Sequence, residues 1–331
     1  MNEKIMALYE MAFRDRYQEV FEDEFQEFFS EIMERAHPDG DFLRVRPWGR
    51  SGDQKNDGYV ISTRTVFAVY APRNPTASAI RNKIESDFEG CLPHWREYID
   101  KWIFVHNDRE GLGPDALKAI LEINKGQNGD LASAWGREAL RSRTMSPEFE
   151  DLKSLFPNVP TLIDFVEVGM EQIQPVLDHL ERVRVPARSD LRPVPEDKIE
   201  YNVLSDATRH LITWGLQPAQ VVRDYYSRVS DELLRDQTAQ AFSDKYAELR
   251  ATGLGPDEIY WEIRKWVLGN GSSNPAREVA AYGVLTYFLK SVTYSCARKE
   301  LKRDDPADQG DFAGPSPPDH WGTGPHCFGG T

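Results

Sequence analysis

The order of apolar and polar residues changes near the middle of the chain, and the two halves predict different folds. In the first half, short runs rich in β-branched and aromatic residues predict strands. These runs are Phe42–Pro47, Tyr59–Ile61, Val66–Tyr70, Trp102–His106 and Leu131–Trp135. Apolar residues at helical spacing, as in Ile80, Ile84 and Phe88, predict helices that alternate with the strands. Residues 1–150 are therefore expected to form an α/β domain with a mixed sheet flanked by helices.

Prolines and helical periodicity set the expected helix boundaries in this half. Lys4–Ala36 is expected to form one or two helices. A further helix is expected to end near Glu89, and Pro93–Lys101 to form another. Residues 148–185 are expected to be mainly helical, with interruptions at Pro157, Pro160 and Pro175.

The second half shows only helical periodicity. Residues 196–300 predict an all-α domain, preceded by a helical connector at 151–195 whose end is a proline-rich linker. The segment Ala276–Cys296 is apolar nearly all round, which predicts either the buried central helix of a bundle or a helix at an interface. Its candidate interface residues are Tyr282, Leu285, Tyr287 and Phe288. Residues 301–331, rich in Asp, Pro and Gly, are expected to be a disordered tail.

Composition narrows the functional class. The 331 residues carry a formal net charge of −14, which argues against a protein that coats nucleic acid. Three widely spaced cysteines favour a reducing cytoplasm. No apolar run reaches the roughly 18–20 residues that cross a bilayer, so no contact with a membrane is expected.

Positive charge gathers locally between Phe42 and Arg81, although the chain as a whole is acidic. A basic patch that contacts DNA is one interpretation, and scattered solvated charge is the other. The candidate nucleic-acid-binding residues are Arg44, Arg46, Arg50 and Arg64.

The segment Gly52–Gly58 carries the strongest candidate chemistry. Asp53, Lys55 and Asp57 lie within five residues, directly before a predicted strand. Metal-dependent phosphodiester hydrolysis uses carboxylates to hold Mg²⁺ or Mn²⁺ and a lysine to stabilise charge. Asp53 and Asp57 are therefore candidate metal ligands, and no tightly bound cofactor is expected otherwise. Tight-turn chemistry explains the same residue types equally well, because Asp and Asn bond to their own backbone and glycine accepts positive φ.

Several short motifs together resemble proteins of bacterial ABC three-component conflict systems. The motifs are F-Q-E-F-F, G-D-Q-K-N-D-G-Y-V, V-Y-A-P and W-I-F-V-H-N-D in the first half, and A-A-Y-G-V-L-T-Y-F-L in the second. The first half is similar to a PD-(D/E)XK restriction-endonuclease-like domain. The resemblance implies that a helical C-terminal domain docks onto a middle component and an SMC-like ABC ATPase.

The same resemblance assigns roles to residues of the first half. Asp57 takes the acidic strand position, and Gln26 takes the position on the preceding helix. On the next strand, Ala68 and Tyr70 stand where an acid or amide and the lysine are expected, so the site looks degenerate. The candidate catalytic residues are Asp57, Lys55 and Gln26.

Three functions follow from these observations. The first is a component of an antiphage or antiplasmid conflict system with a catalytically degenerate nuclease-like domain. The second is a metal-dependent DNA nuclease that a partner activates and that uses Asp57, Asp53 and Lys55. The third is a protein–protein adaptor that never contacts nucleic acid.

Overall fold

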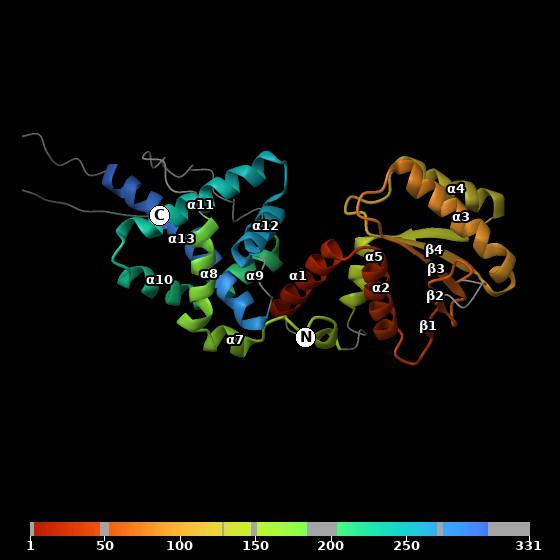
Figure 1. The fold of residues 1–331 in the computed structure, drawn as a ribbon, viewed down its shortest axis with the longest axis horizontal. Coiled ribbons are helices and arrows are strands. Elements are labelled where there is room, and N and C mark those ends of the chain that lie inside the picture. The colour runs from red at the N-terminus through yellow and green to blue at the C-terminus, as the bar shows by residue number, and fades with distance from the viewer. Residues whose placement is uncertain are drawn as a thin grey trace, which may run out of the picture.

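The computed structural model describes residues 3–46, 53–127, 129–146, 151–183, 204–269 and 274–303. These residues form an α/β domain and a helical domain, and the first helix lies between the two (Figure 1). The expected combination of a mixed α/β domain with a helical C-terminal region is confirmed.

The sheet of the α/β domain has five strands in sequence order, and all five were predicted. The strands are β1 (Phe42–Arg44), β2 (Gly58–Val60), β3 (Thr65–Tyr70), β4 (Lys101–His106) and β5 (Ala132–Trp135). Strands β1, β2 and β3 form an antiparallel meander, whereas β4 runs parallel to β3 and β5 runs parallel to β4. Parallel neighbours need crossover connections, and helices α3 (Ala77–Trp95) and α4 (Pro114–Gln127) supply them.

Helices cover both faces of this sheet (Figure 1). Helices α2 (Glu22–Ala36) and α5 (Arg137–Thr144) pack on one face, where Phe29, Phe42 and Phe67 form an aromatic core. Helices α3 and α4 pack on the other face around Trp102 and Phe104. The 3₁₀ turn at Arg96–Tyr98 joins α3 to β4. Both faces are covered, as a partly parallel sheet requires.

The helical domain is built around one apolar helix, α13 (Pro275–Arg303). The helices packed with it are α7 (Leu162–Glu167), α8 (Met170–Val183), α9 (Asp206–Trp214), α10 (Pro218–Arg228), α11 (Glu232–Ala251) and α12 (Pro256–Leu268). Residues from Val279 to Phe288 of α13 lie almost entirely in the core. Gly283 lets α10 approach closely, because a Cβ there would lie 2.5 Å from Cβ of Pro218.

The first helix, α1 (Glu3–Glu19), belongs to both cores. Leu8 and Met11 pack in the helical domain, whereas Phe13 and Tyr17 pack against α2 in the α/β domain. The connector of residues 151–195 is divided in the same way in its described part. The short helix α6 (Leu152–Leu155) joins the α/β core, whereas α7 and α8 join the helical core.

Three helix boundaries differ from the prediction or sharpen it. The predicted segment Lys4–Ala36 is two helices, because Phe21 is extended and the Glu22 N–H donates to the carbonyl of Ala71 instead of continuing the helix. Helix α3 continues through Pro93, and α8 continues through Pro175, so neither proline interrupts its helix. Pro175 is the sixth of the fourteen residues of α8 and Pro93 is the third residue from the end of α3, so each helix lacks one backbone hydrogen bond and still continues.

Two predictions fall outside the described residues. The proline-rich linker around 186–195 and most of the tail at 301–331 lie beyond them. Among the helices that the structure describes, none is long and apolar enough to cross a membrane.

Candidate functional site

Asp57 and Gln26 meet at the start of β2. The Gln26 side-chain amide on α2 donates to Oδ1 of Asp57 at 2.7 Å. The Val69 backbone N–H on β3 donates to the second oxygen, Oδ2, at 2.6 Å. Burial raises the pKa of Asp57 to about 6, the Val69 N–H lowers it, and the carboxylates of Asp53 and Asp87 raise it further. The helix, the strand entry and the next strand therefore converge on one half-buried carboxyl group.

Turn chemistry shapes the loop that delivers Asp57. Oδ1 of Asp53 accepts the backbone N–H of Lys55 at 2.9 Å, and the buried Asn56 accepts the N–H of Gly58 at 3.0 Å. Gln54 and Lys55 adopt the left-handed conformation with φ of 53° and 62°. The turn interpretation of this segment therefore describes a real feature, because the turn brings Asp57 to the strand.

Lys55 forms its ion pair with helix α3 and not with Asp57. Its Nζ lies 3.0 Å from Oδ1 of Asp87, which is buried. Nζ of Lys83, one turn earlier on α3, lies 2.8 Å from Oδ2 of the same carboxylate. The bond to Asp87 is the main reason that the pKa of Lys55 is raised. The structure therefore places two lysines on one buried acid beside the Asp57 carboxyl.

Strand β3 supplies no charged group to this cluster. Ala68 is buried in the core beneath α3. The ring of Tyr70 lies 5.7 Å from Nζ of Lys83, a weak cation–π contact. The positions where the resemblance expects an acid and a lysine therefore carry apolar and aromatic side chains.

The described residues include no group of three or more His, Cys, Asp or Glu side chains placed to hold a metal ion. Asp53 already accepts a backbone N–H, and both oxygens of Asp57 accept hydrogen bonds. These carboxylates do not fit a cage in which protein groups supply most ligands. They could provide at most one or two ligands to Mg²⁺, which usually keeps several of its waters.

The predicted arginines do not form one patch. Arg44 on β1 pairs with Glu27 and Glu34 of α2, at 2.6 and 3.2 Å. Arg64 lies in the turn at the opposite end of β2 and pairs with Asp100 at 3.5 Å. These two positive charges are locally neutralised and point to different ends of the sheet.

The other two predicted arginines add little to a patch. Arg46 is exposed, and Arg50 lies outside the described residues. DNA binding through these four arginines remains a prediction.

The candidate interface residues lie in the chain's own core. Tyr282, Leu285, Tyr287 and Phe288 are all buried, and they pack against α7, α10 and α11. Of the two interpretations of this segment, the structure shows the buried central helix. A partner could reach these side chains only after the bundle opened, so docking by the closed domain would use other residues.

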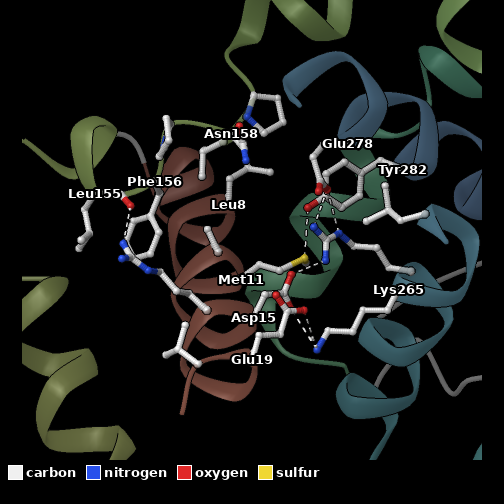
Figure 2. A pocket seen from close by; sticks show the side chains of 18 of the residues that line it. Leu8, Met11, Asp15, Glu19, Leu155, Phe156, Asn158, Lys265, Glu278 and Tyr282 are labelled. Atoms are coloured by element: carbon white, nitrogen blue, oxygen red, sulfur yellow. Dashed lines mark hydrogen bonds and ion pairs between the residues drawn. The ribbon is translucent and has the colours of Figure 1, made fainter. Parts of the chain in front are cut away.

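A second candidate site lies between the two domains (Figure 2). A pocket of about 800 Å³ is open beside α1 and is bounded by α12, α13 and the turn after α6. Its size is that of a small-molecule site. Its lining combines apolar groups with buried charge, as Figure 2 shows for Met11, Asp15, Glu278 and Tyr282.

Arg264 is the centre of the charge in this pocket. Its guanidinium lies 2.5 Å from Oδ2 of Asp15 on α1 and 2.5 Å from Oε2 of Glu278 on α13. Lys265 adds a longer contact of 3.7 Å to Asp15. Because Asp15 comes from the helix shared by both cores, this network ties α1 to the helical domain.

Sequence reasoning missed the buried charges at both sites. Lys83 and Asp87 are four residues apart on a predicted helix, a spacing that permits an ion pair. Asp87 also directly precedes Phe88 of the apolar stripe, which hints at burial. Arg264 pairs with Asp15 across 249 residues, and no local pattern could indicate that contact.

Comparison with known families bears on the helical domain. Residues 171–294 match the model of C-terminal domain 10 of the ABC-three component (ABC-3C) systems. The match begins in α8 and ends in α13, so it spans most of the helical core. No curated protein and no solved structure gives a significant match. The likeness of the first half to restriction endonucleases remains a prediction, whereas the match of the second half supports a role for this chain as a component of an ABC-three component system.

Proposed function

We propose that the protein is the component of a bacterial conflict system that joins a nuclease-like domain to a docking domain. The helical domain docks onto the system's SMC-like ABC ATPase and its middle component. The match of residues 171–294 to an ABC-3C C-terminal domain carries this proposal. The α/β domain is held to the docking domain by α1, so a signal from the assembly has a physical path to it.

The order of elements supports a nuclease-like core. Helix α2, the meander β1–β2–β3, the crossover α3 and the parallel strand β4 follow one another as the resemblance implies. Gln26 and Asp57 also meet, although 31 residues separate them. With Ala68 and Tyr70 on β3, the domain acts alone as an inactive or weakly active nuclease.

Docking by the closed domain requires residues that lie on its surface. Helix α7 exposes three large apolar side chains, those of Leu162, Ile163 and Val166. Exposed apolar clusters on a soluble domain often mark sites of protein interaction. These three residues are the first surface to test.

Co-expression of the full chain with the ABC ATPase and the middle component of its own system tests docking. We expect one complex that co-elutes in size-exclusion chromatography and stays intact after affinity purification. Changing Ile163 and Val166 to Asp is expected to release the chain from the complex without unfolding it. If the wild-type chain elutes alone in every combination, the docking proposal is wrong.

A nuclease that a partner activates is the second candidate function. The contact between Gln26 and Asp57, and the two lysines beside it, favour this function over a plain adaptor. The test incubates the assembled complex with DNA or RNA and with Mg²⁺ or Mn²⁺. Cleavage that disappears in Asp57→Ala supports a nuclease. Absence of cleavage in the full assembly under all conditions leaves the degenerate domain or the adaptor.

A further inference from the structure

Two lysines share one carboxylate beside Asp57, although they come from different elements. Lys55 belongs to the loop before β2, and Lys83 to the second turn of α3. Their Nζ atoms lie 3.0 and 2.9 Å from the same oxygen, Oδ1 of Asp87. The two ammonium groups are therefore close neighbours.

The protein fixes these lysines instead of leaving them to solvent. The stem of Lys55 lies on α3 at Gly90, where a Cβ would come within 2.9 Å of its Cγ. A glycine at this position leaves room for the stem. The left-handed backbone of Lys55 and the bond from its N–H to Asp53 fix where the side chain starts.

Fixed as they are, both ammonium groups stay within reach of a ligand. The side chains of Lys55 and Lys83 are 43% and 32% exposed, whereas that of Asp87 is 4% exposed. A single carboxylate balances only one of the two positive charges. The buried Asp87 thus holds two cations at the surface, and one of them is uncompensated by it.

The surroundings limit which anion can use this charge. The carboxylates of Asp53 and Asp57 lie close enough to influence Lys55, and the whole chain carries a net charge of −14. A small free anion gains one contact and meets this repulsion. A polyanion held at several points, or presented by a partner, gains more than it loses.

We propose that Lys55 and Lys83, held by Asp87, contact one phosphate group of a nucleic acid strand at the Asp57 end of the sheet. Helix α3 and the loop before β2 then supply the positive charge that β3 lacks at Ala68 and Tyr70. The proposal rests on the nuclease-like function proposed above and names the groups that bind its ligand. A lysine ammonium group binds phosphate as a point charge, so this contact carries no preference for base sequence.

Fluorescence anisotropy with labelled single-stranded DNA, double-stranded DNA and RNA over a range of KCl concentrations tests the proposal. The protein is the full chain, alone and in complex with its ATPase and middle component. The variants are Lys55→Met and Lys83→Met, each of which leaves the other lysine to pair with Asp87. Lys83→Arg keeps the charge, and inorganic phosphate serves as a competitor.

A matched control comes from the helical domain. Lys245 also pairs with one acid on its own helix, Glu248, at 2.9 Å, and lies far from the cluster in sequence and domain. Lys245→Met removes the same charge from the protein as Lys83→Met. Thermal melting checks that each variant is folded.

We expect each cluster variant to weaken nucleic acid binding roughly tenfold, the effect of losing one charged contact. The slope of log K against log salt should fall by about 1 in magnitude. Lys83→Arg and Lys245→Met should bind like the wild type.

Unchanged affinity and slope in both folded lysine variants would overturn the proposal. The proposal would also be overturned if the protein bound inorganic phosphate but no nucleic acid, or if neither the chain nor its complex bound nucleic acid. None of these results would contradict the docking proposal. Docking is tested by formation of the complex and by substitutions on α7, and α3 is not part of that surface.

Discussion

Two clusters of buried charge in the described part of the chain are built with opposite signs. In the α/β domain, the buried carboxylate of Asp87 holds two lysines that remain partly exposed. Between the domains, the buried guanidinium of Arg264 holds the carboxylates of Asp15 and Glu278, which are 17% and 8% exposed. The first cluster can offer its outer charges to a ligand. The second keeps the charges of Arg264, Asp15 and Glu278 mostly away from solvent and links α1 to the helical domain, so we call it the joint.

The largest expected effect is at the joint. Arg264→Met leaves two carboxylates with little exposure and without their main cation, and removing one partner of a buried ion pair typically costs about 3–5 kcal/mol. We expect the free energy of unfolding, measured in urea, to fall by that amount. Lys265→Met is the control, because its side chain is more exposed and its contact with Asp15 is 3.7 Å, and it should cost under about 1 kcal/mol. Equal losses in the two variants would contradict the assignment of Arg264 as the joint.

The next effect concerns Asp57, whose carboxyl group lies beside the cluster of Asp87, Lys55 and Lys83, called here the open cluster. Burial raises the pKa of Asp57 to about 6, above the value of about 3.9 in an unfolded chain. The folded state therefore binds this proton more tightly, and the ionised carboxylate costs stability as pH rises from about 4 to 6. Asp57→Asn should be more stable than the wild type at pH 7.5, by at most about 3 kcal/mol, and the difference should vanish near pH 4.

Urea unfolding at a series of pH values measures this difference. Asp100→Asn is the control, because Asp100 is exposed and its ion pair with Arg64 is 3.5 Å long. At pH 7.5 this variant should change the free energy of unfolding by under about 1 kcal/mol. A profile for Asp57→Asn that runs parallel to that of the wild type would show that Asp57 is not held in an unfavourable ionised state.

A smaller effect is expected at the centre of the open cluster. Asp87→Asn removes a buried charge but leaves two lysines that can turn to solvent. We expect the free energy of unfolding to fall by about 1–2 kcal/mol, well below the fall expected for Arg264→Met. Glu85 forms a surface ion pair with Arg81 on the same helix and serves as the control. Glu85→Gln should lower the free energy of unfolding by under about 1 kcal/mol. If Asp87→Asn were as damaging as Arg264→Met, the two clusters would share one structural role.

The smallest effect separates charge from packing within the joint. The hydroxyl of Tyr282 donates to the sulfur of Met11 at 3.1 Å, a weak acceptor, and it also interacts with the Arg264 guanidinium. Tyr282→Phe keeps the ring that stacks on Phe165 and should cost under about 1 kcal/mol in a thermal melt. A loss comparable to that of Arg264→Met would mean that the hydroxyl, and not the ion pairs, secures the joint.

The sequence predicted the strands and most helices because their signals are local. β-Branched runs and helical spacing predicted the elements of both halves, whereas only the family resemblance placed Gln26 and Asp57 in one site. What failed depends on distant contacts. The break at Phe21 exists because the Glu22 N–H donates to the carbonyl of Ala71, and Lys55 forms its ion pair with Asp87 on α3 and not with Asp57.

The apolar stripe of α13 shows a different limit of sequence reasoning. A helix that is apolar all round is buried, but the pattern does not tell whether its own domain or another protein covers it. Here helices of the same chain cover it: Tyr282 packs on Phe165 of α7, and Phe288 packs on Phe242 of α11. Only the fold could direct the search for a docking surface from α13 to the exposed side chains of α7.

The affinity of the full chain for its ABC ATPase and middle component tests the central claim most directly. Calorimetric titration would compare the wild type with Lys83→Met in the α/β domain and with Ile163→Asp on α7. We predict a stable complex whose dissociation constant is unchanged by Lys83→Met and raised at least tenfold by Ile163→Asp. A complex weakened by Lys83→Met and not by Ile163→Asp, or no complex at all, would contradict a docking role for the helical domain.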